Sequence, residues 1–241
     1  MTSMKKKTII FGATGSVGAS LANLLYEEKK DCHLVGRNEE ELKKISNKLS
    51  YTYSVCDVLK IDFMKNLLEE LSSTEITGVA YCVGSIDLKP FKNTKANDFV
   101  SSYVLNLVAA TEIVRSFEEN LKRNKGSVVL FSTVAAKKGF TNHSIISSAK
   151  SAVEGLTVAL AAELAPHIRI NCIAPSLTKS KIANTVIRNS TIEQSIAKLH
   201  PLKRIGEGID SANLANFLLK ETSSWITGQI IAVDGGRSSI A

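Results

Sequence analysis

The cysteines of this 241-residue chain are few and unpaired in sequence. Cys32, Cys56, Cys82 and Cys172 stand far apart without a C-x-x-C spacing, and the four histidines do not cluster near them. Zinc sites and disulfide frameworks depend on such spacings. We therefore expect no metal site and no disulfide, and we interpret the four thiols as free, buried side chains.

We also expect neither a bilayer-spanning apolar run nor a leader segment. No hydrophobic stretch approaches the length that a bilayer-spanning helix needs. The first residues, MTSMKKK, run directly into a strand-like segment, which leaves no room for the apolar stretch and cleavage site of a signal peptide. We expect a cytoplasmic protein with no membrane partner.

Cations outnumber acids, with 30 Lys and Arg against 23 Asp and Glu and a formal charge of +7. The cations are nevertheless spread along the chain, and aromatic residues do not interleave with them as they do in nucleic-acid-binding surfaces. We expect no nucleic-acid partner, and at most some attraction for phosphorylated small molecules.

What is present is a globular composition and a regular alternation of element types. With 44% hydrophobic and 22% charged residues, the chain is long enough to bury one sizeable core. Short β-branched runs predict strands at residues 8–11, 33–36, 51–56, 78–83, 127–132, 168–173 and 229–233. Helical patterns lie between them, at residues 17–29, 39–49, 60–71, 96–123, 147–164 and 210–219.

This alternation predicts an α/β fold, because parallel strands need crossover connections and the helices supply them. We expect a single-domain, Rossmann-type doubly wound parallel sheet of about seven strands with helices on both faces. Neither a Pro/Gly/Ser-rich linker nor a repeat divides residues 1–241, so one domain is expected. Residues 176–208 resist assignment, and we interpret this long segment as a substrate-binding loop or lid.

A glycine-rich turn follows the first predicted strand. Glycines three residues apart let the backbone turn tightly and approach a pyrophosphate, whose negative charge is stabilised by the N-terminus of the next helix. A plain strand-to-helix turn is the alternative, but the position at the start of a βαβ unit favours dinucleotide binding. The residues are Gly12, Ala13, Thr14, Gly15, Ser16, Val17 and Gly18.

The end of the second predicted strand discriminates between the two nicotinamide dinucleotides. A carboxylate there would bind the adenosine ribose of NAD and repel a 2′-phosphate. The sequence has Gly36, Arg37 and Asn38 instead, with no acid before Glu39. An arginine beside the ribose suits a 2′-phosphate, so we predict NADP(H) and consider NAD the less favoured cofactor. The alternative is that Arg37 only faces solvent.

Beyond these two features, the chain resembles the short-chain dehydrogenase/reductase family over nearly its whole length. The matching segments follow one another in the family's order: Asp57-Val58, Val83-Gly84, Asn106-Leu107, residues 149–157, 163–165, 170–175, 201–206, 226–229 and 233–236. The resemblance implies an oxidoreductase with a small-molecule substrate. It also implies cofactor contacts from Asp57, Val58, Val83, Gly84, Lys150, Pro175, Thr178 and Ser180.

The sequence departs from the family at two motifs. Tyr81 and Cys82 replace the two asparagines of the family's Asn-Asn-Ala-Gly motif, and Pro175 is followed by Ser176 where the family has Pro-Gly. The usual side-chain contacts of the Asn-Asn-Ala-Gly motif are not expected here.

The resemblance also implies that Asn106 holds a structural water in a proton relay.

The most consequential departure concerns the family's proton donor, a tyrosine four residues before the lysine. The residue four before Lys150 is Ile146, and the residue thirteen before Ile146 is Thr133, where the family has a serine that orients the substrate oxygen. A gap in the comparison cannot supply the phenol, since the last of the five tyrosines is Tyr103. Of the expected catalytic set, Asn106, Thr133 and Lys150 remain.

His143 is a candidate stand-in, because it lies three residues before Ile146 and a histidine gains and loses its proton near neutral pH. A surface or capping role is the alternative. Ser144 and Ser147 flank the same place, but hydroxyls are poor acids without an adjacent base. We interpret Tyr81 and Tyr103 as structural.

Two functions follow from this pattern. The first is an NADP(H)-dependent oxidoreductase with altered proton delivery, acting on a C=O, C=C or C=N group. The second is a catalytically weak or inactive NADP-binding homologue that acts as a sensor or silent subunit. Retention of Thr133 favours the first function. The helix at residues 147–164 is apolar around more than one face, so we also expect a homo-oligomer, most simply a tetramer.

Overall fold

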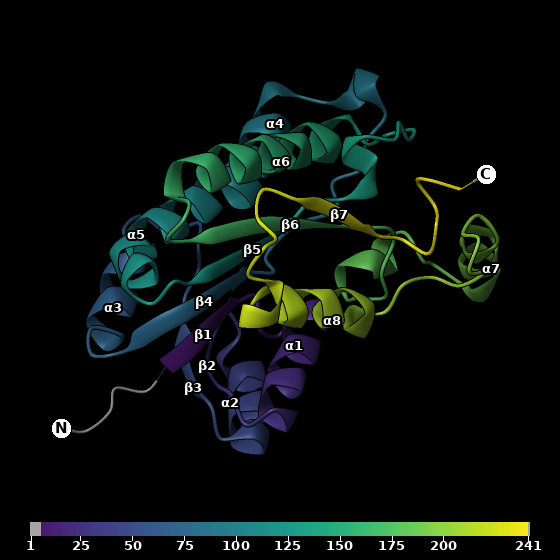
Figure 1. The fold of residues 1–241 in the computed structure, drawn as a ribbon. Helices are drawn as coiled ribbons and strands as arrows, with labels where there is room; N and C mark the ends of the chain where they lie inside the picture. The colour runs from purple at the N-terminus through teal and green to yellow at the C-terminus, as the bar shows by residue number, and fades with distance from the viewer. Residues whose placement is uncertain (1–5, 241) are drawn as a thin grey trace.

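The computed structural model describes residues 6–240, and at its centre lies a seven-stranded parallel sheet in the order β3-β2-β1-β4-β5-β6-β7 (Figure 1). Each neighbouring pair of strands is parallel. The doubly wound sheet predicted from the sequence is therefore confirmed. The strands are β1 (Lys6–Phe11), β2 (Asp31–Gly36), β3 (Thr52–Val55), β4 (Glu75–Tyr81), β5 (Ser127–Phe131), β6 (Arg169–Pro175) and β7 (Ile230–Val233).

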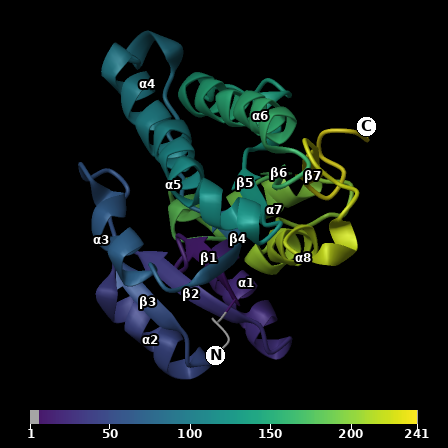
Figure 2. The ribbon, with the colours of Figure 1, turned by 60° about the vertical axis from the view of Figure 1, so that its left-hand side comes forward.

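Helices cover both faces of this sheet. The helices α1, α2 and α8 lie on one face, and α3 to α6 lie on the other (Figures 1 and 2). Their bounds are α1 (Ser16–Glu27), α2 (Glu39–Leu49), α3 (Phe63–Glu70), α4 (Ala96–Tyr103), α5 (Ala109–Arg123), α6 (Ser144–Leu164), α7 (Ser190–Lys198) and α8 (Gly208–Leu218). Short helical turns are η1 (Phe91–Asn93), η2 (Val104–Val108), η3 (Val134–Ala136), η4 (Ile182–Thr185) and η5 (Glu221–Ser223).

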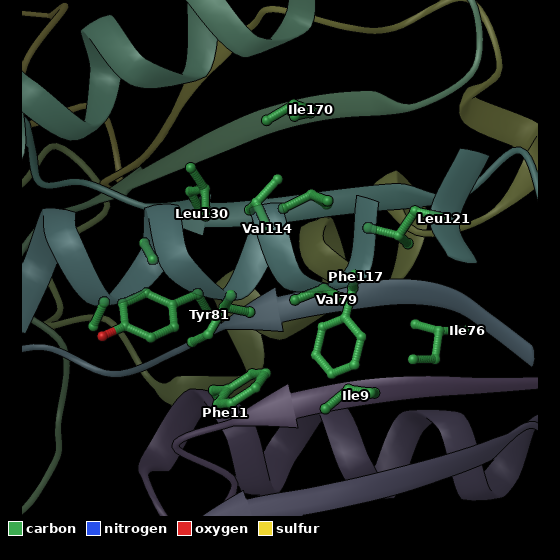
Figure 3. Packing of buried hydrophobic residues seen from close by; sticks show 14 of the residues in the cluster. Ile9, Phe11, Ile76, Val79, Tyr81, Val114, Phe117, Leu121, Leu130 and Ile170 are labelled. Atoms are coloured by element: carbon green, nitrogen blue, oxygen red, sulfur yellow. The ribbon is translucent and has the colours of Figure 1, made fainter. Parts of the chain in front are cut away.

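Each face of the sheet has its own apolar core, which explains why the strands read as continuous apolar runs. Along β1, Ile9 and Phe11 join the cluster beneath α5, whereas Ile10 joins the cluster beneath α1 and α8. Phe11 packs against Tyr81 with 6.3 Å between ring centroids, and Phe117 of α5 covers the same region (Figure 3). Successive side chains of a strand point to opposite faces, so a central strand covered on both faces needs apolar residues throughout.

The helix predicted at residues 96–123 has those bounds but is interrupted by a turn of π-helix, η2, between α4 and α5. The Tyr81 hydroxyl donates a hydrogen bond of 2.6 Å to the Leu105 carbonyl inside this turn. Single π-helical turns occur often at functional sites. Here the turn contains Asn106, whose side chain it buries.

Four expectations need correction. Helix α6 begins at Ser144 rather than Ser147, and residues 176–208 are not irregular throughout, because they contain η4 and α7. Helix α6 also has the length and mean hydropathy of a membrane-spanning helix, contrary to the expectation that no such segment exists. It packs against β6 and buries Lys150 and Glu154, and its buried apolar residues, including Ile145, Val153 and Leu164, belong to the core. All four cysteines are free, and Cys82 is only half-buried.

Candidate active site

A cavity of about 1570 Å³ opens at the carboxyl ends of the central strands. It lies where the strand order reverses between β1 and β4, which is where open α/β sheets bind ligands. The volume exceeds that of a typical site for one small ligand, so it leaves room for a dinucleotide and a substrate together. The residues predicted for the site line the cavity, with the exceptions of Ala13, Gly18 and Asn106.

The glycine turn at one side of the cavity has the geometry that a diphosphate requires. Gly12 adopts φ +76°, and a Cβ there would come within 2.9 Å of the Cys82 carbonyl group. A Cβ at Gly18 would lie 2.4 Å from the Gly12 oxygen, so this glycine allows α1 to pack closely against the turn. Gly15 precedes α1 without a side-chain capping bond. The first amides of the helix are therefore available for an anion in the cavity.

The part of the cavity predicted to bind the adenosine is lined by Arg37, Asn38, Asp57 and Val58. Arg37 is exposed, and Asn38 caps α2 by accepting a 3.1 Å bond from the Glu41 amide. Asn38 thus has a structural role that the sequence did not indicate. Lys181, beside η4, forms an ion pair with Glu41 and connects the 176–208 segment to α2 at the cavity edge.

Lys150 projects from α6 into the wall of the cavity and is only 6% exposed. Its ammonium group donates a 2.8 Å hydrogen bond to the Phe131 carbonyl at the end of β5. Burial lowers the pKa of Lys150 to about 8, because a charged amine loses hydration there. The side chain can therefore exchange a proton near physiological pH.

Asn106 lies beside Lys150 and has an unused acceptor. Its amide nitrogen donates to the Ser102 carbonyl at 2.9 Å, and its buried Oδ1 has no hydrogen-bond partner among the described residues. A Cβ at Gly84 would lie 3.3 Å from both Asn106 Oδ1 and Lys150 Nζ. Gly84 therefore leaves open a small polar space that these two atoms share.

Thr133 and Ile146 line the cavity close to Lys150 in the fold. Thr133 lies directly after β5, and its hydroxyl oxygen accepts a 3.3 Å bond from the Ala135 amide, so its proton remains free to be donated. Ile146 is 5% exposed and lies one helical turn before Lys150, on the same face of α6. An apolar side chain therefore occupies the position where the resemblance expects a phenol.

His143 immediately precedes α6 and lines the cavity, as the stand-in hypothesis requires. Its Nδ1 lies 2.7 Å from the Thr141 carbonyl, which can only accept, so Nδ1 carries a proton and Nε2 remains available. The ring packs on Phe140 with 5.4 Å between centroids. The imidazole makes no side-chain capping bond to α6.

Tyr81 and Tyr103 are held by backbone carbonyls, as a structural role predicts. Burial raises the pKa of Tyr81 strongly, and its hydroxyl is taken up by Leu105. The Tyr103 hydroxyl donates to the Ser148 carbonyl at 3.3 Å. Neither residue lines the cavity.

The structure brings further polar residues into the cavity that the sequence analysis did not assign. Ser176 and His200 line it and form a hydrogen bond of 2.8 Å with each other. Arg237 lies over the Phe140 ring at 5.4 Å. The departure from Pro-Gly at residue 176 was a signal for Ser176, but no local spacing connects it to His200, which lies 24 residues further along the chain.

Comparison with known proteins places the chain in a family. A family model described as enoyl-(acyl carrier protein) reductase matches residues 12–238. A tropinone reductase homologue of Arabidopsis thaliana is 31% identical, with 96% of this chain and 91% of the relative covered. The chain belongs to the short-chain dehydrogenase/reductase family.

Other short-chain dehydrogenases/reductases are similar in sequence and in structure. A 3-oxoacyl-[acyl-carrier-protein] reductase of Rickettsia felis is 28% identical, with 96% of both chains covered. A short-chain dehydrogenase/reductase of Mycobacterium ulcerans superposes with a TM-score of 0.90 at 25% identity, over 99% of this chain and 91% of that one. The enzyme ElxO, solved with NADP bound, superposes with a TM-score of 0.87 at 25% identity, over 98% of this chain and all of that one.

Proposed function

We propose that this short-chain dehydrogenase/reductase is an NADP(H)-dependent oxidoreductase that reduces a carbonyl group, or a related C=C or C=N group, without a phenolic proton donor. The observation that carries the proposal is the buried Lys150 in a dinucleotide-sized cavity that also holds Thr133 and the apolar Ile146. A protein that only bound the nucleotide would not need a hydroxyl group at the position of Thr133.

Several side chains would hold the cofactor. The amides of the glycine turn and of α1 would bind the diphosphate, and the Arg37 guanidinium would bind the 2′-phosphate. Lys150 would hydrogen-bond the nicotinamide ribose, and Thr178 and Ser180 would contact the carboxamide and the diphosphate. When bound, the reduced cofactor supplies a hydride to the substrate. The NADP in the ElxO structure supports this choice of dinucleotide.

The remaining residues act on the substrate oxygen. Thr133 donates one hydrogen bond that orients the oxygen, and the Lys150 ammonium raises the local positive potential where negative charge develops. The 176–208 segment would form the substrate wall. Apolar substrates fit this wall best, because its lining is mainly aliphatic: Leu177, Ile182, Val186, Ile196 and Leu199.

A titration and a turnover measurement test the proposal together. We expect NADPH to bind more tightly than NADH by fluorescence titration, and we expect slow oxidation of NADPH when apolar ketones and aldehydes are added. Equal or tighter binding of NADH would contradict the cofactor assignment. Binding without any oxidation across ketone, enone and imine panels, in wild type and in the Ile146→Tyr variant, would contradict the enzymatic function.

A further inference from the structure

Ser176 and His200 form a hydrogen-bonded pair that faces the cavity. Ser176 Oγ lies 2.8 Å from His200 Nε2, and both residues line the cavity wall. Ser176 immediately follows β6, whereas His200 lies just after α7 and is 2% exposed. This hydroxyl is a departure from the family, because the chain has Ser176 where its relatives are expected to have glycine.

The second ring nitrogen of His200 determines the direction of this bond. Nδ1 lies 2.9 Å from the Ile196 carbonyl, which can only accept, so Nδ1 carries a proton. In the neutral ring, Nε2 is then an acceptor and the Ser176 hydroxyl donates to it. In the charged ring, Nε2 donates to Ser176 Oγ instead, and the hydroxyl proton of Ser176 is free to bond a group in the cavity.

The pair lies at the end of the cavity that contains His143, as the contacts of Arg237 indicate. Arg237 connects the two walls of that end: its guanidinium lies over Phe140, which packs on His143, and it donates a 3.0 Å bond to the Leu199 carbonyl beside His200. A substrate at this end would contact the Ser176 hydroxyl from within the cavity.

Charged side chains of the C-terminal segment lie near His200. Burial opposes the ionised form of Asp234, but hydrogen bonds from Ser238 and from the Gly236 amide more than offset burial and hold the pKa of Asp234 below its usual value, so a carboxylate lies near the ring. Arg237 is the nearby cation on the C-terminal segment, and Lys203 directs its ammonium to the Lys198 carbonyl. A carboxylate near a histidine ring attracts the positive charge of the protonated ring.

We propose that Ser176 and His200 are a proton relay that protonates the substrate oxygen in place of the missing phenol. This inference rests on the proposed function. As hydride from the reduced nicotinamide adds to the carbonyl carbon, the C=O π electrons move to oxygen, and this oxygen takes the Ser176 hydroxyl proton. Ser176 Oγ simultaneously takes the Nε2 proton of His200, which becomes neutral. Water entering the cavity after product release restores the proton to His200 by the same route.

The test compares the relay variants in two backgrounds. Ser176→Gly and His200→Asn remove the two members, and Ser176→Ala repeats the first change without added backbone freedom. The control is His167→Asn, because His167 is exposed and lies outside the cavity. Each change is made in wild type and in Ile146→Tyr, which restores a phenol one turn from Lys150.

In wild type we expect each relay variant to lower the rate of carbonyl reduction at least about tenfold, since general acids contribute about 10²–10⁴-fold. In the Ile146→Tyr background the same variants should change the rate less than about twofold, because the phenol then supplies the proton. Equal losses in both backgrounds, or no loss in wild type, would overturn the relay while leaving the oxidoreductase function standing.

A second readout does not depend on turnover. Nitrogen NMR of histidine-labelled protein reports the protonation of each ring nitrogen, and His200→Asn identifies the His200 signals. We expect Nδ1 to be protonated and Nε2 to accept a hydrogen bond at high pH, with a clear Nε2 shift in Ser176→Ala. An Nε2 signal that Ser176→Ala leaves unchanged would contradict the pairing. Loss of carbonyl reduction in His143→Ala but not in Ser176→Gly would assign the proton to His143 and overturn the relay.

Discussion

Replacing Lys150 by methionine should change how the stability of the protein depends on pH. Lys150 is buried, and burial lowers its pKa to about 8 in the folded protein from about 10.5 in the unfolded chain. Between these values the folded lysine is neutral while the unfolded lysine is still protonated. The unfolded state therefore binds more protons, and the free energy of unfolding of wild type rises with pH over this window.

The expected magnitude follows from the two pKa values. Integrating the linkage relation from pH 7 to about pH 10 gives wild type about 2.5 kcal/mol of additional stability relative to Lys150→Met. At pH 7 the comparison is less informative. The methionine relieves a buried charge, but it also leaves the Phe131 carbonyl without its donor, and that loss costs about 1–3 kcal/mol.

The assay is urea unfolding of both cofactor-free proteins across this pH range, with stabilities taken by linear extrapolation. Far-UV circular dichroism is the better probe, because the single tryptophan, Trp225, is 98% exposed and its emission would change little. Other titrating groups are common to both proteins and cancel in the difference. A difference that stays flat from pH 7 to about pH 10 would refute the depressed pKa.

Three further predictions concern the cofactor, acid stability and assembly. Arg37→Ala should weaken NADPH binding by about 10-fold or more and leave the affinity for NADH almost unchanged, since a charge-assisted hydrogen bond is worth about 1.5–3 kcal/mol. Equal losses of affinity for both cofactors, measured by calorimetry, would contradict this. Burial lowers the pKa of His33 to about 4, so the unfolded state binds a proton that the folded state lacks between about pH 6.5 and 4. The free energy of unfolding should therefore fall by about 3 kcal/mol as the pH drops through this range. His33→Gln should abolish this fall in urea titrations. Wild type should form a homotetramer, and Val158→Glu should form a smaller species, because the Val158 side chain is 51% exposed on the outer face of α6. A monomeric wild type in light scattering would contradict the expected assembly.

Local sequence patterns were sufficient for the sheet and for the glycine turn beside the cavity. The β-branched runs predicted the strands because each central strand is buried on both faces, and the glycine turn has the close approaches that only glycine allows. The π turn around Asn106 was not visible, since one inserted residue barely disturbs helical periodicity. Helix α7 could have been predicted, because Asn189 caps it by accepting a bond from the Ile192 amide.

The substrate side depends on contacts between distant segments. The bond between Ser176 and His200 joins residues 24 positions apart, and the Lys181–Glu41 ion pair joins residues 140 positions apart. Sequence spacing gives no information on such pairs. It did identify Ile146 correctly as a residue beside Lys150, because positions four apart share one face of a helix.

The rate of NADPH oxidation by wild type and Ile146→Tyr, measured with the same panel of apolar ketones and aldehydes, tests the account most directly. Hydride addition creates an alkoxide that must be protonated or stabilised as it forms, and Thr133 and Lys150 do not replace a phenol. We expect wild type to bind NADPH and reduce these carbonyls slowly, and the variant to be faster by at least about tenfold, provided that its melting curve shows a folded protein. Brisk reduction by wild type that Ile146→Tyr, His143→Ala and Ser176→Gly all leave unchanged would contradict the account of this site.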